Sequence, residues 1–197
     1  MKALDRYTYR FDGSPQRITL HWTGGSYTPS SLDAEHYHFL IDGDGCVWLG
    51  KYSVADQDLT ASKYAAHCAG FNTKNIGVAF CAMAGAQENG SFGKYPINQL
   101  QWQVAIELCA WLLRGYGLNP TESCLASHCE IERIHGRKQS GKWDVSAVKF
   151  RNETWSELND VFRNLVREYK DEAIEDEDMP EITVTVPIGT IVNVVEI

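Results

Sequence analysis

Residues 76–82 read Ile-Gly-Val-Ala-Phe-Cys-Ala, a continuous apolar run with polar loop sequence on both sides. An apolar run of this length without alternation is typical of a strand that is buried on both faces. Such strands lie at the centre of sheets that helices cover. The sequence therefore predicts one α/β domain with a mixed central β-sheet, around which the other elements are arranged.

Two more strands are expected earlier in the chain. Residues 17–21, Arg-Ile-Thr-Leu-His, alternate and end on His21, and the glycines that follow favour a histidine that faces a cleft. Residues 36–41 form the next strand, which returns through the turn Asp-Gly-Asp-Gly, a strong hairpin signal. The pattern leaves open whether the face with Tyr37 or the opposite face looks into a site. The short connection between His21 and Tyr37 leaves little room for a helix.

Two amphipathic helices are expected to flank the sheet. The helix over residues 98–116 has an apolar stripe formed by Leu100, Val104, Leu108, Trp111 and Leu112. The second helix starts at a Thr-Trp-Ser-Glu capping box, and its stripe consists of Trp155, Leu158, Phe162, Leu165 and Tyr169. The domain expected from these elements covers residues 1–170, followed over 171–197 by an acidic linker and a β-rich C-terminal tail.

The composition is that of a soluble globular protein, with 44% hydrophobic and 22% charged residues. The net charge of −8 argues against a nucleic-acid partner, because binding to phosphates needs a basic patch. There is no apolar run long enough for a membrane span. Charged residues throughout the first twenty positions leave no room for a signal peptide, so we expect a protein that is cytoplasmic as made, or one exported by a route that needs no cleavable leader.

The six cysteines are scattered, and most are interpreted as buried free thiols in a reducing compartment. Cys124 and Cys129, together with His128 and His135, could form a small structural zinc site. Their irregular spacing matches no familiar zinc finger.

Residues 127–144 contain an unusual set of polar side chains for a segment between two helices. His128 and Asp144 are two of the three protein ligands that a catalytic zinc site needs. Lys142 lies two residues before the carboxylate, where a positive charge could stabilise an oxyanion. A solvated loop with a helix-capping aspartate is the other interpretation. His21, at a strand end, could supply the third ligand.

Several short motifs occur in the same order as in a known superfamily. The chain resembles the zinc-dependent N-acetylmuramoyl-L-alanine amidases of type 2, which include bacteriophage lysozyme-type amidases and animal peptidoglycan recognition proteins. The resemblance covers roughly residues 17–166. The motifs that carry it are Leu-His-Trp-Thr (20–23), Tyr-His-Phe-Leu-Ile (37–41), Asp-Gly (44–45), Ala-His-Cys-Ala-Gly-Phe-Asn (66–72), Asn-Ile-Gly-Val (75–78), Ser-His-Cys-Glu (127–130) and Lys-Trp-Asp (142–144).

The resemblance implies that His21, His128 and Asp144 bind zinc. It also implies that Tyr37 assists catalysis and that Lys142 stabilises the intermediate.

Two further residues would lie beside the substrate groove, His67 and Asn72. For His67, a loop position with hydrogen bonds to the backbone is the other interpretation. His38 is expected to form hydrogen bonds within the sheet. Cys129 is not expected to bind the metal, since neighbours in an extended chain point apart.

The sequence departs from the family at two points. Bacterial recycling-type members have a glutamate where this chain has Ala79, so no general base is expected from that strand. The Asp-Pro-Gly of the family is replaced by Asp-Val-Ser at residues 144–146, which weakens the turn signal.

The predicted function is hydrolysis of the amide bond between N-acetylmuramic acid and L-alanine in peptidoglycan, by zinc-activated water. The expected protein is a phage or prophage endolysin that is made in the cytoplasm and acts on the cell wall after release. A non-catalytic peptidoglycan-binding protein of the same fold and a cell-wall recycling amidase are the alternatives.

Overall fold

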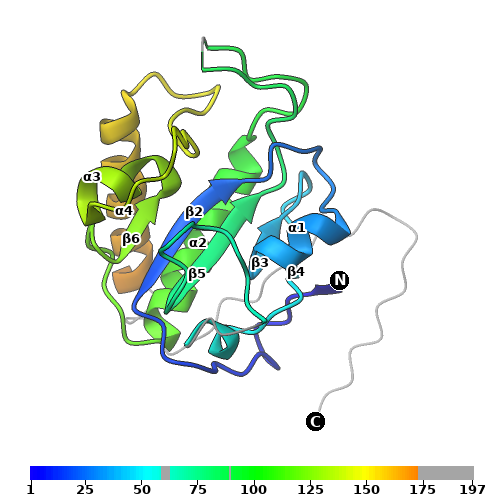
Figure 1. Ribbon diagram of the computed structural model, residues 1–197, viewed down its shortest axis with the longest axis vertical. Helices are drawn as coiled ribbons and strands as arrows, with labels where there is room; N and C mark the ends of the chain where they lie inside the picture. The colour runs from blue at the N-terminus through cyan, green and yellow to red at the C-terminus, as the bar shows by residue number, and fades with distance from the viewer. Residues whose placement is uncertain (59–62, 89, 173–197) are drawn as a thin grey trace.

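The computed structural model describes residues 1–58, 63–88 and 90–172, and Figure 1 shows the arrangement of their elements. Within these residues a mixed sheet of six strands has the order β1-β4-β3-β5-β2-β6. The strands are β1 (Lys2–Ala3), β2 (Arg17–Trp22), β3 (Phe39–Ile41), β4 (Val47–Leu49), β5 (Asn75–Phe80) and β6 (Leu125–Ser127). Strand β5 runs parallel to β2 and β3, while β4 is antiparallel to β3 and β1. The predicted α/β class and the central place of β5 are confirmed.

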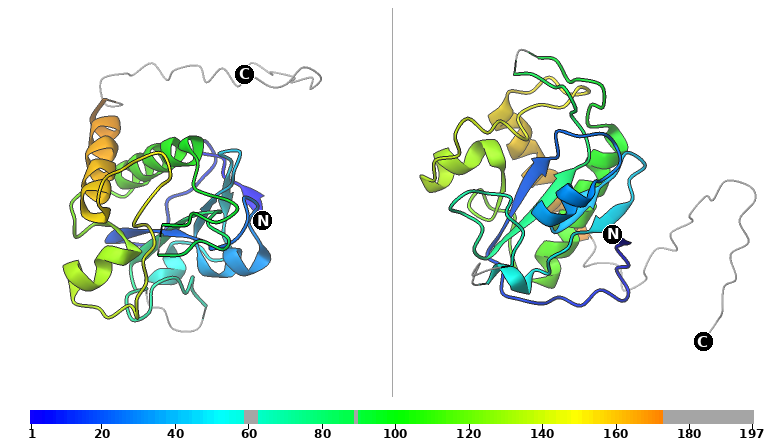
Figure 2. Two further views of the ribbon diagram at one scale, coloured as in Figure 1. Left: turned by 90° about the horizontal axis from the view of Figure 1, so that it is seen from above. Right: turned by 45° about the vertical axis from the view of Figure 1, so that its right-hand side comes forward.

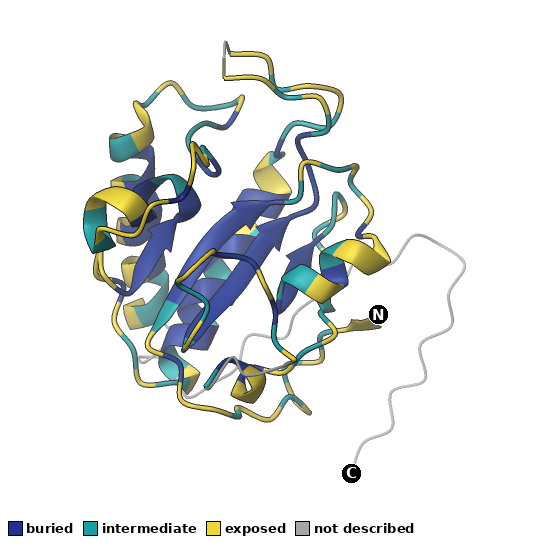
Figure 3. Ribbon diagram, viewed as in Figure 1, coloured by how far each residue is buried: buried dark blue, intermediate teal, exposed yellow. Residues whose placement is uncertain are grey.

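The two faces of the sheet have different roles. Helices α2 (Gln99–Gly115) and α4 (Trp155–Glu172) lie on one face, and the short helix α1 (Ser31–His36) lies on the other (Figure 2). Alternate residues of β2, such as Ile18 and Leu20, belong to the large core under α2 and α4. His21 has the opposite parity and therefore faces away from that core. Figure 3 shows β5 buried along its length, and β2 is buried from Ile18 to Trp22.

The predicted strand over 36–41 is wrong at its first three residues. Ser30 begins α1 with a capping box, in which its hydroxyl accepts from the Asp33 amide and the Asp33 carboxylate accepts from the Ser30 amide. This helix continues through His36, and β3 begins only at Phe39. A helix therefore does fit between His21 and Tyr37, because it needs only six residues.

The helix predictions are confirmed in position, and one residue of each predicted apolar stripe is exposed. Helix α2 starts after the N-cap Asn98, and α4 starts after Thr154, whose capping box with Glu157 forms as predicted. Leu100 is 52% exposed and Trp155 is 40% exposed, so neither belongs to the buried stripes. Residues 171 and 172 extend α4, and the predicted β-rich tail lies outside the described residues.

None of the helices within the described residues combines the length and the apolar character that a membrane crossing requires.

Candidate functional site

Three of the predicted site residues converge on the face of the sheet opposite α2. His21 lies near the end of β2, His128 begins the 3₁₀ helix η2 (His128–Glu130), and Asp144 lies in the segment after helix α3 (Ile131–His135). The Nδ1 atoms of His21 and His128 are 2.9 and 3.2 Å from Oδ2 of Asp144. One ligand atom from each residue lies within 4.8 Å of the other two, and all three residues are buried. Ligand atoms around a tetrahedral zinc ion are about 3.3 Å apart, since each lies about 2.0–2.2 Å from the metal.

The ionisation of the three residues favours a cation between them. Asp144 is buried, which opposes ionisation, but contact of its carboxylate with the imidazoles of His128 and His21 holds the pKa of Asp144 well below its usual range. Burial lowers the pKa of His21 to about 4. Burial opposes charge on His128 too, yet the hydrogen bond to Asp144 raises the pKa of His128 to about 10. The site thus holds a carboxylate that attracts positive charge.

The hydrogen bonds of His128 fix which of its ring nitrogens faces Asp144. The side-chain amide of Gln139 donates from Nε2 to the carbonyls of Ala69 (3.1 Å) and Arg137 (3.2 Å). Its Oε1 therefore faces His128 Nε2, at 2.9 Å, and can only accept. The hydrogen of a neutral His128 ring is thus on Nε2, and its Nδ1 lone pair points to Asp144.

The ligand atoms of His21, His128 and Asp144 show whether a metal ion fits this site. Two imidazole nitrogens and a carboxylate oxygen repel one another in a buried site unless protons or a metal ion lie between them. Zn²⁺ prefers this donor set, and three protein ligands leave a fourth position for water. The residues present fit a zinc ion. The ligand roles of His21, His128 and Asp144 remain predictions.

His67 lies next to His21, in the segment that precedes β5. His67 is 7% exposed, its Nδ1 lies 3.0 Å from Nε2 of His21, and its Nε2 lies 2.9 Å from the carbonyl oxygen of Asn75. Both ring nitrogens are therefore engaged within the protein. The Oδ1 of Asn72 accepts from the amides of His67 (3.1 Å) and Cys68 (2.8 Å) and fixes this turn. The predicted roles of His67 and Asn72 in substrate binding stay predictions.

Tyr37 and Ala79 lie on the same side of the sheet as His21. The rings of Tyr37 and His21 have centroids 5.2 Å apart, and burial raises the pKa of Tyr37 well above its usual value. Its hydroxyl therefore keeps its proton at neutral pH. Ala79 pairs with His21 in the register of β2 and β5, so a methyl group lies where a carboxylate would approach His21. His38 accepts a hydrogen bond from the Gly77 amide at 2.9 Å, as the sheet-bound interpretation predicted.

Lys142 is exposed and lines a cavity of about 360 Å³, whose wall includes chain neighbours of His128 and Asp144 but none of the three convergent residues. The cavity lining includes Cys129, which follows His128, and Trp143, which precedes Asp144. Phe92 and Trp155 add aromatic surface to its wall. This cavity therefore combines the ammonium of Lys142, the carboxylate of Glu88 and aromatic surface.

The cysteines do not support a structural metal site. Among the described residues, the His/Cys/Asp/Glu group with metal-ligand spacing is the one formed by His21, His128 and Asp144. The thiol of Cys129 instead donates to the carbonyl of Val145 at 3.5 Å. All six cysteines are free, and four of them, Cys68, Cys81, Cys109 and Cys124, are buried as predicted.

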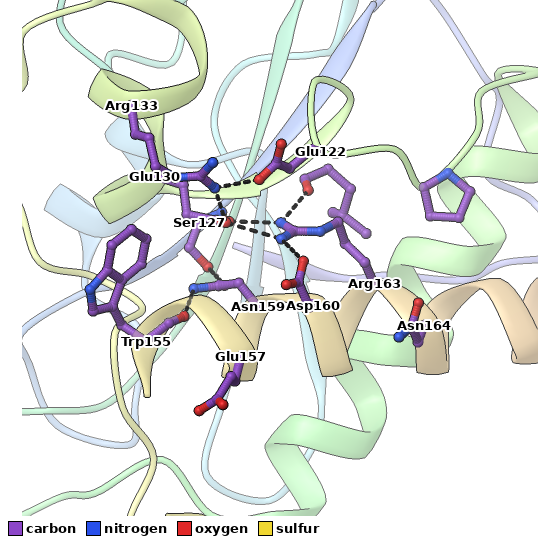
Figure 4. Close-up of polar contacts among 12 residues, drawn as sticks. Glu122, Ser127, Glu130, Arg133, Trp155, Glu157, Asn159, Asp160, Arg163 and Asn164 are labelled. Carbon is purple, nitrogen blue, oxygen red and sulfur yellow. Dashed lines mark hydrogen bonds and ion pairs between the residues drawn. The ribbon is translucent and has the colours of Figure 1, made fainter. Parts of the chain in front are cut away.

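A buried polar cluster ties α4 to the segment that carries His128 (Figure 4). Arg163 of α4 forms two parallel hydrogen bonds with Glu130, Nη1 to Oε2 at 2.8 Å and Nη2 to Oε1 at 3.1 Å. Glu130 is fully buried and also accepts from the Ser127 amide at 3.0 Å. Arg163 donates further to the carbonyl of Leu125 in β6. The ion pair thus fixes the strand end on which His128 is placed.

Asn159, one turn earlier on α4, connects both ligand-bearing segments. Its Oδ1 accepts from the Ser127 hydroxyl, next to His128 (Figure 4). Its Nδ2 donates to the Val145 carbonyl, next to Asp144, at 3.2 Å. The Cys129 amide donates directly to the Asp144 carbonyl at 2.6 Å. The two segments are therefore held together by backbone as well as by α4.

The sequence analysis did not identify Gln139, Glu130, Asn159 or Arg163. The two α4 residues had a detectable signal: each directly follows a residue of the predicted apolar stripe, at Leu158 and Phe162, and they are four residues apart. Polar residues at helical spacing beside a core stripe indicate a buried polar contact. Glu130 completes a Ser-His-Cys-Glu capping-box pattern with Ser127, which indicates its contact with the Ser127 amide but not its pairing with Arg163. Gln139 had no such signal.

Comparison with known proteins was made for sequence and for structure. The family model for N-acetylmuramoyl-L-alanine amidase matches residues 11–145. No curated protein matches the sequence. Among solved structures, the Ph2119 endolysin from Thermus scotoductus MAT2119 bacteriophage Ph2119 is 17% identical with a TM-score of 0.43, covering 82% of this chain and 89% of that chain.

Two other solved structures have similar values. The endolysin LysCS, an N-acetylmuramoyl-L-alanine amidase from Clostridium intestinale URNW, is 17% identical with a TM-score of 0.42, covering 66% of this chain and 77% of that chain. Drosophila PGRP-LB is 16% identical with a TM-score of 0.39, covering 68% of this chain and 89% of that chain. Because the family model matches more than half of the chain, this protein belongs to the N-acetylmuramoyl-L-alanine amidase family.

Proposed function

We propose that this protein is a zinc-dependent amidase that hydrolyses the bond between the lactyl group of N-acetylmuramic acid and L-alanine in peptidoglycan. The observation that supports this most directly is the convergence of His21, His128 and Asp144, buried together in a chain of this family. A zinc ion bound by these residues would supply a Lewis acid and a water of lowered pKa.

The residues around the ion would share the remaining work. Asp144 stays ionised and offsets the charge of the metal. Tyr37 retains its proton and can donate a hydrogen bond toward the reacting groups. The ammonium of Lys142 would stabilise negative charge on the scissile carbonyl oxygen. With Ala79 beside His21, no carboxylate base comes from that position of β5.

The biological setting that we propose is a phage or prophage endolysin, made in the cytoplasm and acting on the cell wall after release. A non-catalytic peptidoglycan-binding protein is the second candidate, and it would retain the groove without hydrolysis. A cell-wall recycling amidase is the third, and the methyl group of Ala79 disfavours it because recycling-type members have a glutamate there.

The test of the proposal uses the purified wild-type protein. We expect about one zinc ion per chain and release of free stem peptide from purified peptidoglycan, with no new reducing sugar ends. If the protein contains no zinc and binds peptidoglycan without cleaving it, the result would support a non-catalytic peptidoglycan-binding protein. If the protein retains zinc but releases no peptide, the zinc has a structural role.

Lys142→Ala should lower turnover by roughly 10²–10³-fold, the usual loss when a group that stabilises an oxyanion is removed. Zinc content should not change, because Lys142 is no ligand. Lys138→Ala removes another exposed lysine from the same segment and should leave turnover near the wild-type value. If zinc content and turnover fall together in Lys142→Ala, Lys142 has a structural role instead.

A further inference from the structure

Two hydrogen bonds of His67 have a direction that the chain itself determines. The carbonyl oxygen of Asn75 is an acceptor only, so His67 Nε2, at 2.9 Å from it, must carry a hydrogen. In a neutral imidazole the other nitrogen then has a free lone pair. His67 Nδ1 is therefore an acceptor, and it lies 3.0 Å from His21 Nε2. His21 must donate from Nε2, which leaves the lone pair of His21 on Nδ1.

The position of the His67 ring is fixed by its surroundings. A Cβ added at Gly77 would lie 2.8 Å from Cγ of His67, so the ring packs directly on the β5 backbone where there is no side chain. The turn that carries His67 is held by Gln57, whose Nε2 donates to the carbonyls of Ala65 (3.1 Å) and Asn72 (3.0 Å). The ring consequently has no room to turn away from His21.

The contacts from the Asn75 carbonyl through His67 and His21 to Asp144 form a row that lacks one hydrogen at the Asp144 end. Between the Asn75 carbonyl and the Asp144 carboxylate there are three short contacts, which involve the rings of His67 and His21. Two neutral rings supply only two hydrogens. With the first two contacts filled from the Asn75 end, the contact between His21 Nδ1 and Asp144 Oδ2 lacks one. A cation at that contact completes the row.

We propose that His67 is a positioning residue that holds His21 in the tautomer with its Nδ1 lone pair directed at Asp144, and so prepares His21 to bind a metal ion. This inference rests on the proposed zinc site. It assigns to His67 a role in metal affinity, and this role is distinct from contact with the substrate. Loss of an outer hydrogen-bond partner of a ligand histidine lowers metal affinity by roughly 10–100-fold.

The test compares two substitutions by zinc affinity, measured in competition with a chelator. His67→Leu removes the acceptor and should weaken zinc binding by about 10–100-fold. His67→Asn places a carbonyl oxygen close to where Nδ1 stood, and it should recover most of the affinity. His38→Asn is the matched control. His38 is also buried, and its ring centroid lies 5.8 Å from that of His67, but its Nδ1 bonds to Gly77. This control should leave zinc affinity unchanged.

A second readout does not depend on activity or on stability. In zinc-loaded protein with ¹⁵N-labelled histidine, His21 should carry its ring hydrogen on Nε2, with the exchange of this hydrogen slowed. In His67→Leu the Nε2 hydrogen should lose its slow exchange. The inference is wrong if His67→Leu, folded by circular dichroism, binds zinc like wild type, or if His21 carries its hydrogen on Nδ1. A wild-type protein that binds no zinc would instead refute the proposed function.

Discussion

Asp144→Ala should abolish both zinc retention and the release of stem peptide. The substitution removes one of three converging ligands, and it also removes the negative charge that attracts a cation into the buried site. The loss of zinc affinity should exceed the roughly 10–100-fold that follows from loss of an outer partner. The measurement is zinc content after dialysis, together with peptide release from purified peptidoglycan under the same conditions.

Two variants separate the ligand role from other effects of Asp144→Ala. Asp144→Asn keeps the size and part of the hydrogen bonding but not the charge, and it should lose zinc almost as completely. Asp171→Ala removes an exposed carboxylate at the end of α4 and should change neither quantity. If Asp144→Ala retains zinc while replacement of Cys124 or Cys129 by serine unfolds the protein, the structural zinc site is the correct reading.

Arg163→Met should destabilise the fold by up to about 3–5 kcal/mol, because it removes the two-bond buried partner of Glu130 and leaves that carboxylate with the Ser127 amide and the exposed Arg133, at 3.2 Å. For a domain of this size the midpoint of thermal unfolding should fall by roughly 6–20 °C. Zinc binding should weaken as well, since Glu130 holds the strand end that carries His128. Thermal unfolding followed by circular dichroism, with and without added zinc, measures both effects.

Arg167→Met is the matched control for this prediction. Arg167 lies one turn further along α4, is exposed, and bonds to Asn164 and to the Pro120 carbonyl. Its loss should cost less than about 1 kcal/mol. Adding Glu130→Gln to Arg163→Met removes the buried charge that has lost its main partner and should recover part of the lost stability. If Arg163→Met is no less stable than Arg167→Met, the ion pair does not hold the domain together.

The strands could be predicted from the sequence because their signals are local. The apolar run at β5, the alternation in β2 and the Asp-Gly turn after β3 each lie within a few residues. The error at His36 arose where two local signals competed. A β-rich stretch suggested a strand, but the capping box at Ser30 and Asp33 starts a helix that includes His36.

The helix faces were harder to predict, since a stripe of apolar residues does not show which edge of the stripe packs. Leu100 and Trp155, in the first turns of α2 and α4, are 52% and 40% exposed. Sequence periodicity shows which side of a helix is apolar, but the elements packed against the helix decide which of its turns are buried.

The convergence of His21, His128 and Asp144 followed from a resemblance, because side chains 123 residues apart have no local signal of proximity. The partners of these residues could not be predicted in this way. Gln139 and His67 each contact one candidate ligand through one hydrogen bond. The direction of that bond depends on a backbone carbonyl that lies nearby only in the folded chain. Such contacts exist only in three dimensions.

Helix α4 contributes no ligand, yet Asn159 connects it to the residues beside both His128 and Asp144. Thermodynamic linkage is reciprocal: if docking of this helix favours the bound arrangement of the ligands, metal binding favours docking of the helix by the same free energy. Transient local opening of α4 should therefore be rarer in the loaded protein than in the metal-free protein. A bound ion would thus stabilise the docked position of α4 without contacting this helix.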